Sequence, residues 1–431
     1  MRQFLLLTTI FFALQNAAAQ DIFIKNVHII PMTNNKVLEH QSLLIRDGKI
    51  IEIGDHTKLK SPPQTKIIDG NGRFLMPGLA DMHVHLPSAE MIDNCLLLNV
   101  AAGVTHIRVM NSKTYQPDIA ARVKKDKEMI RPDIHFSLVL SRSVIYTPMQ
   151  YDSLFSAMEN NGLSFVKLFS LPDSITFEHI MASAEKNNIT VCGHYPGYVV
   201  EGKWKNLPLA KVLKSGFKSI EHLGGYDLAD TESEIDQAVK LSKENEVYNC
   251  PTIDWDVIAA DLEYPEKYKE RITYTSLPDH VINKWEASYG EAIEKAGGRD
   301  SVIHMANKYR PKYLAKHRLL KKLSDSGALL LMGADAGNDF QLDGFNIYEE
   351  MHAWSKAGID NYSILKSATV NPARFYKESD IWGTIEVGKK ADLVFLEKNP
   401  LIDIKNIASI YSTVINGKVY SKKDLMKRAG F

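Results

Sequence analysis

The sequence predicts an α/β fold: a (β/α)8 barrel of the TIM type, with a small β-sandwich domain formed by both chain ends. Eight apolar, strand-like segments recur in the middle of the chain, and the stretches between them carry apolar residues at the i, i+3 and i+4 spacing of helices. Both chain ends carry short alternating segments separated by turn residues. An open doubly wound sheet is the alternative for the middle. It normally shows a glycine-rich nucleotide turn after its first strand, and the sequence has none there.

Residues 1–20 have the order of a secretory signal peptide. Arg2 precedes the apolar run FLLLTTIFFAL, and three small residues, Ala17 to Ala19, precede Gln20. The run is too short for a membrane span with its flanks, and a buried N-terminal strand or helix is the other interpretation. We therefore expect an exported protein, periplasmic or secreted after cleavage.

Residues 21–75 and 381–431 are predicted to form the two parts of the β-sandwich. The first part contains SLLIRDGKIIEIG, with a turn at Asp47-Gly48. The second contains GTIEVGKKADLVFLE and YSTVINGKVY, with a turn at Asn416-Gly417. Because the same pattern appears at both ends, we expect the ends to pair into one module.

Residues 76–380 are predicted to form the barrel. The active sites of such barrels lie at the C-terminal ends of the strands. One residue near the end of each segment is, in order, His83, Arg108, Leu140, Lys167, His194, His222, Cys250 and Asp335. The first seven follow one another at about 25 to 30 residues, the length of one strand and one crossover helix.

The interval before the last segment is longer and is predicted to be a helical insertion at about residues 255–325. It is rich in aromatic residues: Trp255, Tyr264, Tyr268, Tyr274, Trp285 and Tyr289. Long insertions at the catalytic rim of a barrel often act as lids. A solvated helical decoration is the other interpretation, since aromatic residues at helical spacing usually pack in a local core.

The composition excludes several classes of function. The 431 residues are 45% hydrophobic and 24% charged, which excludes a disordered chain. Lys and Arg total 52, as do Asp and Glu, so no net charge favours nucleic acid or an anionic membrane as a partner. The 3 cysteines include no CxxC pair, so a metal would need nitrogen and oxygen ligands. We expect a small-molecule substrate, and a homo-oligomer is compatible with the sequence.

Four histidines and one aspartate at the strand ends are candidate metal ligands. His83 and His85 are two residues apart on a strand and share a face, although a barrel core can also satisfy such a pair by hydrogen bonds. His194 and His222 end the strands of CGHYPG and SIEHLGG. Asp335, after the apolar run LLLMGA, could bind metal and accept a proton, or cap the following helix.

Lys167 lies within the apolar segment SFVKLFS, where an unpaired ammonium would be costly. Its head could reach water at the strand end while its stem packs. Alternatively, burial lowers the pKa of the amine, and the neutral amine captures carbon dioxide as a carbamate that bridges two metal ions.

All of these groups lie at the ends of strands of one predicted barrel. Packing alone explains this coincidence poorly, so we expect a divalent metal site. Zinc suits nitrogen and oxygen ligands best, although manganese, cobalt or iron could use the same geometry. His106 and His135 also belong to predicted strands, and we interpret them as core or supporting residues.

The sequence resembles the amidohydrolase superfamily of metal-dependent hydrolases. The matching stretches are FLMPGLADMHVHL, GVTHIRVM, SIEHLGG, GADAG, SATVNPARFY and GTIEVGKKADLVFLEKNPL. The resemblance implies a (β/α)8 barrel with two metal ions, most similar to prolidase-like dipeptidases. It implies the following roles: His83 and His85 bind the more buried metal, Lys167 is the carbamylated bridge, His194 and His222 bind the more exposed metal, and Asp335 is ligand and proton shuttle.

Two stretches depart from that pattern. The second strand reads IRVM where relatives usually carry an arginine-aspartate pair, and the third reads SRSVIYTP where prolidase-like members often have Gly-Gly-His. The sequence therefore leaves the substrate open. Tyr195, Tyr198 and Tyr146 could bind a substrate carboxylate or carbonyl, or could be ordinary packing residues.

The expected activity is hydrolysis of a carbon–nitrogen bond, in an amide or peptide-like small substrate, by a hydroxide that bridges the two metals. One alternative is a mononuclear deaminase or a hydrolase of cyclic amides or lactones, in which Lys167 is a plain lysine. An alternative of another class is a catalytically silent barrel used for binding. A serine hydrolase is excluded because the sequence contains no GxSxG elbow.

Overall fold

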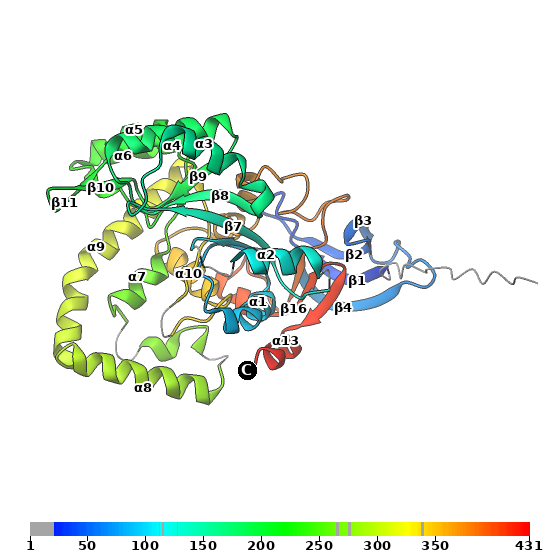
Figure 1. The fold of residues 1–431 in the computed structure, drawn as a ribbon. Helices are drawn as coiled ribbons and strands as arrows, with labels where there is room; N and C mark the ends of the chain where they lie inside the picture. The colour runs from blue at the N-terminus through cyan, green and yellow to red at the C-terminus, as the bar shows by residue number, and fades with distance from the viewer. Residues whose placement is uncertain are drawn as a thin grey trace, which may run out of the picture.

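The computed structural model describes residues 21–431 except 112, 114, 115, 127, 264–266, 275, 276, 338 and 339. The expected signal peptide and Tyr264 lie outside the described residues. The molecule has a seven-stranded sheet at one end and an arm of two long helices at the other, with an eight-stranded parallel sheet and its helices between them (Figure 1).

The eight-stranded sheet is parallel throughout, and its strands neighbour one another in chain order. The backbone N–H of Met82 donates to Met332 O at 2.8 Å and that of Asp335 to His83 O at 2.9 Å, which links the first strand to the segment after the last. This curled sheet is consistent with the predicted TIM-like barrel. Its strands are β5 (Leu79–Val84), β6 (Val104–Val109), β7 (Asp133–Leu140), β8 (Leu163–Leu168), β9 (Thr190–Gly193), β12 (Ser219–Glu221), β13 (Tyr248–Cys250) and β14 (Leu329–Leu330).

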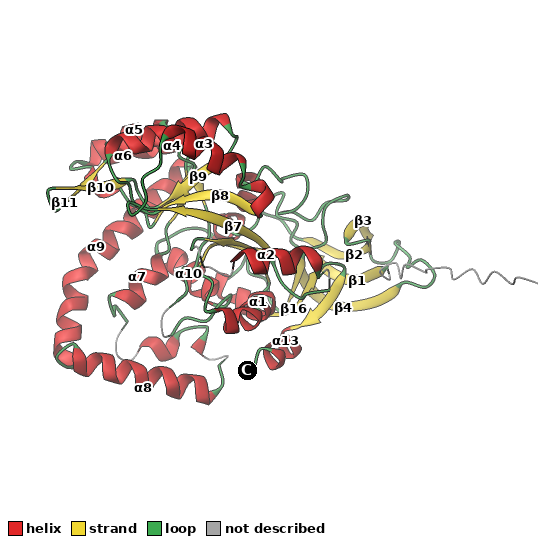
Figure 2. Ribbon diagram, in the orientation of Figure 1, coloured by secondary structure: helices red, strands yellow, loops and turns green. Residues whose placement is uncertain are grey.

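Helices follow most of these strands and cover the outside of the sheet (Figure 2). Their apolar faces and the sheet form the large core, which includes Trp354 of α10 and Phe177 of α4. The helices are α1 (Ile92–Ala101), α2 (Gln116–Lys125), α3 (Pro148–Ser156), α4 (Ser174–Lys186), α5 (Leu209–Lys214), α6 (Glu232–Glu244), α10 (Asn346–Lys356), α11 (Asn361–Ser367) and α12 (Val370–Phe375). A short hairpin, β10 (Gly197–Val200) and β11 (Lys203–Asn206), follows β9.

Side-chain caps fix the start of three helices that follow the strands. Thr147 and Gln150 form a capping box before α3, and Thr231 and Glu234 form another before α6. Asp173 accepts hydrogen bonds from two backbone amides at the start of α4. Because these caps satisfy otherwise unpaired N–H groups, they hold the loops at the C-terminal strand ends in place.

The segment predicted as a helical insertion contains α7 (Ile253–Ala259), the 3-10 helix η4 (Lys267–Glu270), α8 (Asp279–Lys295) and α9 (Arg299–Ser326). Helices α8 and α9 form an L-shaped arm on the side away from the seven-stranded sheet (Figure 1). No residue of α8 is fully buried, whereas α9 contributes Leu320 and Leu323 to the main core.

The two chain ends pair within one seven-stranded sheet, in the order β17-β16-β15-β4-β1-β2-β3. An isolated bridge between Lys49 and Lys390 joins the edge strand β3 to the segment that enters β15, and apolar residues such as Leu43 and Phe395 form the core. The expected pairing of the ends is therefore present, as one hydrogen-bonded sheet. The elements are β1 (Ile22–Ile29), β2 (Leu38–Arg46), β3 (Lys49–Asp55), β4 (Lys66–Pro77), β15 (Leu393–Leu396), β16 (Ile410–Ile415), β17 (Lys418–Ser421) and the terminal helix α13 (Lys422–Arg428).

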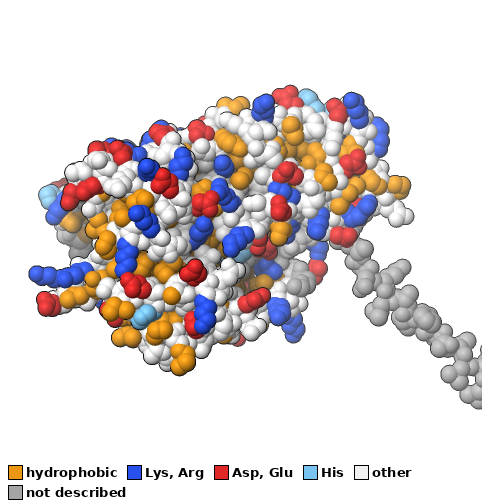
Figure 3. Space-filling model, turned by 90° about the horizontal axis from the view of Figure 1, so that it is seen from above, with side chains coloured by type: hydrophobic (Ala, Val, Ile, Leu, Met, Phe, Trp, Pro, Cys, Tyr) orange, Lys and Arg blue, Asp and Glu red, His pale blue; other side chains and the backbone are white. Residues whose placement is uncertain are grey.

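The surface agrees with the balanced charge of the sequence. On the face drawn in Figure 3, basic and acidic side chains lie interspersed with apolar ones, and neither sign forms a continuous field. No helix among the described residues combines the length and apolar character that crossing a bilayer requires.

Candidate metal centre

All six residues predicted as ligands lie at the C-terminal edge of the eight-stranded sheet. His83 is near the end of β5 and His85 directly follows it, and Lys167 is near the end of β8. His194, His222 and Asp335 follow the ends of β9, β12 and β14. The parallel topology brings them to one edge because each crossover returns the chain to the same side.

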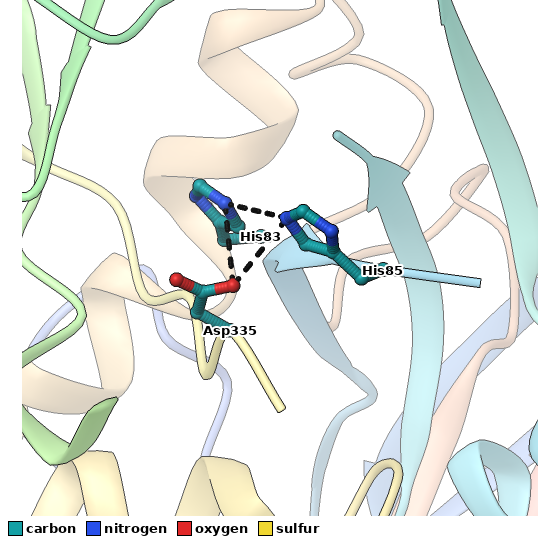
Figure 4. A group of neighbouring side chains, drawn as sticks. All are labelled: His83, His85 and Asp335. Atoms are coloured by element: carbon teal, nitrogen blue, oxygen red, sulfur yellow. Dashed lines mark hydrogen bonds and ion pairs between the residues drawn. The ribbon is translucent and has the colours of Figure 1, made fainter. Parts of the chain in front are cut away.

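Three of these side chains form a close triad (Figure 4). The His83 Nε2 and His85 Nε2 atoms are 3.3 Å apart, and Asp335 Oδ1 is 3.5 Å from the first and 3.4 Å from the second. This spacing is that of three ligand atoms each about 2 Å from a common centre, the bond length of zinc to imidazole and carboxylate. The triad therefore fits a divalent metal.

A buried ion pair orients His83. Glu221, the last residue of β12, is 1% exposed, and its Oε2 lies 2.8 Å from His83 Nδ1. The Arg108 Nη2 donates to the other oxygen, Oε1, at 2.7 Å, and the Arg108 Nε donates to Met82 O. Because the carboxylate paired with Arg108 accepts, His83 Nδ1 carries the proton. Its Nε2 is left with a lone pair that faces His85 and Asp335.

His222 is oriented by a second chain of hydrogen bonds. The Thr252 hydroxyl donates to Pro251 O at 2.8 Å, and His222 Nδ1 lies 2.6 Å from the Thr252 Oγ1. The hydroxyl proton is already used, so His222 Nδ1 is the donor in this contact and Nε2 keeps its lone pair. The His222 ring lies 4.9 Å from that of His83 and 5.0 Å from that of His194.

Lys167 is 1% exposed, so its head does not reach bulk water. Its Nζ lies 5.8 Å from the centre of the Phe169 ring, and among the described residues no carboxylate forms an ion pair with it. Burial lowers the pKa of this amine, and the negative charges of Glu221 and Asp335 oppose the shift.

The four imidazoles are neutral at pH 7 in this environment. Burial lowers the pKa of His85 and of His194 to about 4, and holds that of His83 and His222 well below the usual value. The positive charge of Lys167 adds to the shift in all four cases. Neutral imidazole is the form that binds metal.

The pKa of the Asp335 carboxyl group, in contrast, is raised. Burial raises its pKa to about 7, against the opposing charge of Lys167. Asp335 therefore exchanges protons near neutral pH when no metal is bound.

Backbone strain and close packing fix these positions. His222, Leu223 and Asp335 have φ values of 60°, 55° and 49°, in the left-handed region that residues with a Cβ seldom adopt. Beside them, a Cβ added to Gly333 would lie 2.7 Å from His83 Cβ and 2.5 Å from Cys250 Sγ. Only glycine lets the segment after the last strand approach His83 this closely.

Two pockets flank the centre. The first, which we name the polar pocket, has a volume of about 530 Å³, and its lining includes His85, Asp335, Asn111, Lys113, Trp255 and Gln341. The second, the apolar pocket, has a volume of about 430 Å³, and its lining includes His222, Leu223, Tyr226, Ile235, Ala315 and Leu319. The Trp255 ring lies 6.2 Å from the His222 ring, so the two pockets meet near this pair.

The three tyrosines predicted to bind substrate lie outside the linings of both pockets. The Tyr195 hydroxyl donates to Leu207 O at 2.8 Å, and its ring is buried in the main core. Tyr198 is half-buried in β10, and Tyr146 packs edge-on against Tyr151. Among the described residues, neither the polar nor the apolar pocket has Tyr195, Tyr198 or Tyr146 in its lining.

Sequence reasoning missed the residues that support the ligands. The sequence pattern marks Arg108 only as a strand end, and it does not distinguish Glu221 or Thr252. A charged residue in the middle of an apolar strand, such as Arg108 in THIRVM, was the available signal, since it must find a buried partner.

Comparison with known proteins places this centre in a family. The model of the amidohydrolase family matches residues 74–420. The adenine deaminase of Ruegeria sp. (strain TM1040) is 35% identical over 71 residues, which are 16% of this chain and only 12% of that protein. The 5-methylthioadenosine/S-adenosylhomocysteine deaminase of Caldanaerobacter subterraneus subsp. tengcongensis is 23% identical, over 94% of each chain.

A solved structure of a Xaa-Pro dipeptidase with bound methionine has the same fold. Its TM-score is 0.68 at 19% identity, covering 93% of this chain and 100% of that one. The family match spans most of the barrel and the return into the seven-stranded sheet, which confirms the resemblance found in the sequence. The chain belongs to the amidohydrolase family.

Proposed function

We propose that this protein is an exported, metal-dependent hydrolase that cleaves the carbon–nitrogen bond of a small amide or peptide-like substrate. The observation that carries the proposal is the triad of His83, His85 and Asp335, whose three ligand atoms lie within 3.5 Å of one another beside the buried Lys167. The neutral imidazoles of His194 and His222 extend the donor set.

The donor set suits two divalent metal ions, and zinc fits its nitrogen and oxygen atoms best. His83 and His85 would hold one ion, His194 and His222 the other, and Asp335 would be a further ligand. Lys167 would bridge them as a carbamate: its neutral amine forms a bond to the carbon of carbon dioxide and loses one proton, which leaves an anion. The lowered pKa of Lys167, caused chiefly by its burial, favours this step.

The metal ions would supply Lewis-acid chemistry and a water that is acidic enough to react at neutral pH. Asp335 would accept a proton from this water as its oxygen forms a bond to the substrate carbonyl carbon. It would then return that proton to the nitrogen as the carbon–nitrogen bond breaks and the nitrogen takes the bonding electron pair. Because burial raises the pKa of Asp335, its carboxyl group suits both transfers.

Metal analysis and one substitution test this function. We expect two metal ions per chain, with reconstitution dependent on bicarbonate, and turnover of members of a panel of dipeptides, acylated amino acids and lactams. Asp335→Asn should retain most of the metal and lose about 10²- to 10⁴-fold in kcat, the usual contribution of a general base. The exposed Asp118→Asn is the matched control and should react normally. A near-normal kcat for Asp335→Asn would overturn the assigned role.

A mononuclear enzyme is the second candidate, favoured by the deaminase that is similar over 94% of the chain. In this case one metal ion would occupy the triad and Lys167 would be a plain lysine. One metal ion per chain, no effect of bicarbonate, and turnover of aminopurines, cyclic amides or lactones would support it. Metal-loaded protein that binds such compounds without converting them would indicate a silent barrel used for binding.

A further inference from the structure

The polar pocket has one feature that the proposed chemistry does not use. Lys113 carries the only ammonium or guanidinium group among the described residues of its lining. It is exposed, and no described carboxylate forms an ion pair with it. The pocket therefore contains a positive charge that is free to meet a negative group of a ligand.

Neither acidic residue of the same lining forms an ion pair with Lys113 among the described residues. Asp335 belongs to the triad, and the Asp343 carboxyl group forms a hydrogen bond with Cys95. Lys113 lines the same pocket as His85 and Asp335 of the triad. A carboxylate held by Lys113 would thus lie in the pocket that opens on the triad, with the Asn111 and Gln341 amides in the same lining.

The apolar pocket on the other side of the centre differs in chemistry. Of its two lysines, Lys316 pairs with Asp256 at 2.6 Å, and Lys312 shares the lining with the carboxylate of Asp227. The remaining lining is mainly aliphatic and aromatic, as in Leu223 and Tyr226. This pocket is suited to an uncharged, apolar group.

The role proposed for Asp335 determines which half of the substrate lies in each pocket. Under the proposed function it gives its proton to the leaving nitrogen, so the amine half of the substrate must lie on the side of Asp335. Asp335 lines the polar pocket together with Lys113, whereas His222 lines the apolar pocket. The amine half therefore lies beside Lys113 and the acyl half lies beside His222.

On the basis of the proposed function, we propose that Lys113 is a specificity-determining residue. It binds a carboxylate on the amine half of the substrate. The substrate class is then an amino acid acylated by an apolar group. Its free carboxylate lies against Lys113 and its acyl chain lies in the apolar pocket.

A matched pair of compounds tests the proposal. N-hexanoyl-L-leucine carries the carboxylate, and N-hexanoyl-3-methylbutylamine is the same amide without it. The wild-type enzyme should prefer the first compound, chiefly through KM. Lys113→Met should lower kcat/KM for N-hexanoyl-L-leucine by about 10- to 100-fold, the usual value of a charge-assisted hydrogen bond, so that the preference is largely lost. Lys113→Arg should keep most of it. The exposed Lys124→Met, on α2, changes net charge equally and should leave the preference intact.

A binding measurement separates failure of this inference from failure of the proposed function. On the Asp335→Asn background, calorimetry should show N-hexanoyl-L-leucine binding about 10- to 100-fold more weakly when Lys113→Met is added. If wild-type enzyme cleaves both compounds equally, or if Lys113→Met changes neither preference nor binding, the role of Lys113 is wrong while amide hydrolysis stands. If no amide is cleaved but Lys113→Met still weakens binding, the carboxylate site stands and the proposed reaction does not.

Discussion

Glu221 links the candidate metal centre to the barrel interior. Its carboxylate touches His83 Nδ1 on one side and the Arg108 guanidinium on the other, and all three side chains are buried. Such a partner fixes the tautomer and the orientation of a ligating imidazole, and its loss typically weakens metal binding by 10- to 100-fold.

Glu221→Gln should raise the Kd for zinc by about 10- to 100-fold, measured by competition with a chelator. It also leaves Arg108 buried without a counter-charge, which should lower the free energy of unfolding by about 3–5 kcal/mol. The double variant Arg108→Met, Glu221→Gln removes both charges and should regain stability but not metal affinity. Glu244→Gln, at an exposed site on α6, is the control. Wild-type zinc affinity in the double variant would contradict the positioning role.

The Glu221–His222 pair also shows what the sequence could not predict. Neighbouring residues of a strand point to opposite faces, so a pattern that directs His222 to the centre directs Glu221 away from it. In the structure both reach the centre because β12 ends at Glu221 and His222 turns to a φ of 60°. Side-chain type identified the candidate ligands, but this local backbone conformation follows from tertiary packing.

The insertion and the Asp335 loop meet at Phe340. Phe340 lies five residues after Asp335 and is 5% exposed. Its ring centre is 4.8 Å from that of Tyr268, 5.3 Å from that of Tyr289 and 5.9 Å from that of Trp285, all in the insertion. These contacts tie η4 and α8 to the loop that carries Asp335.

We therefore expect Phe340→Ala to loosen both elements. Removing a buried phenyl ring typically costs about 3–5 kcal/mol, and here the loss falls on the contact between α8 and the loop. Limited proteolysis within α8 (Asp279–Lys295) should accelerate, and kcat should fall because Asp335 is less well held. Phe340→Leu keeps most of the apolar volume and serves as the matched control. Unchanged proteolysis together with unchanged kcat in Phe340→Ala would mean that the insertion is a decoration, the other interpretation of the sequence.

Most strands could be predicted from the sequence, and one hairpin could not. Buried parallel strands are continuous apolar runs, which is why the segments ending near His83, Lys167 and Cys250 coincide with β5, β8 and β13. The β10–β11 hairpin lies outside the barrel and has half-exposed residues, so it lacks such a run. Its only strong signal was the turn at Glu201-Gly202, which is too short to define two strands.

For the molecule as a whole, Lys390 joins the two sheets. Its Nζ lies 2.7 Å from Asp133, at the start of β7, and 2.7 Å from Asp392, just before β15. The Asp392 side chain is 3% exposed, and His106 Nε2 lies 3.4 Å from it. These acidic groups and His106 have the spacing of a metal site, but the ammonium of Lys390 already holds the position of the cation.

Lys390→Met should consequently destabilise the whole chain rather than one module. The substitution leaves the buried Asp392 carboxylate without its counter-charge, whereas Asp133 keeps Arg131 at 3.3 Å. Breaking a buried ion pair from one side typically costs about 3–5 kcal/mol, and we expect the lower end of this range because Lys390 and Asp133 are partly exposed. Urea unfolding followed by tryptophan fluorescence should show this loss in a single transition, because the eight-stranded and seven-stranded sheets share the site. Adding Asp392→Asn removes one orphaned charge and should restore part of the stability, whereas the exposed Lys398→Met should change it by less than about 0.5 kcal/mol. A Lys390→Met protein in which the seven-stranded sheet melts first, in a separate transition, would show that the two sheets are stabilised independently.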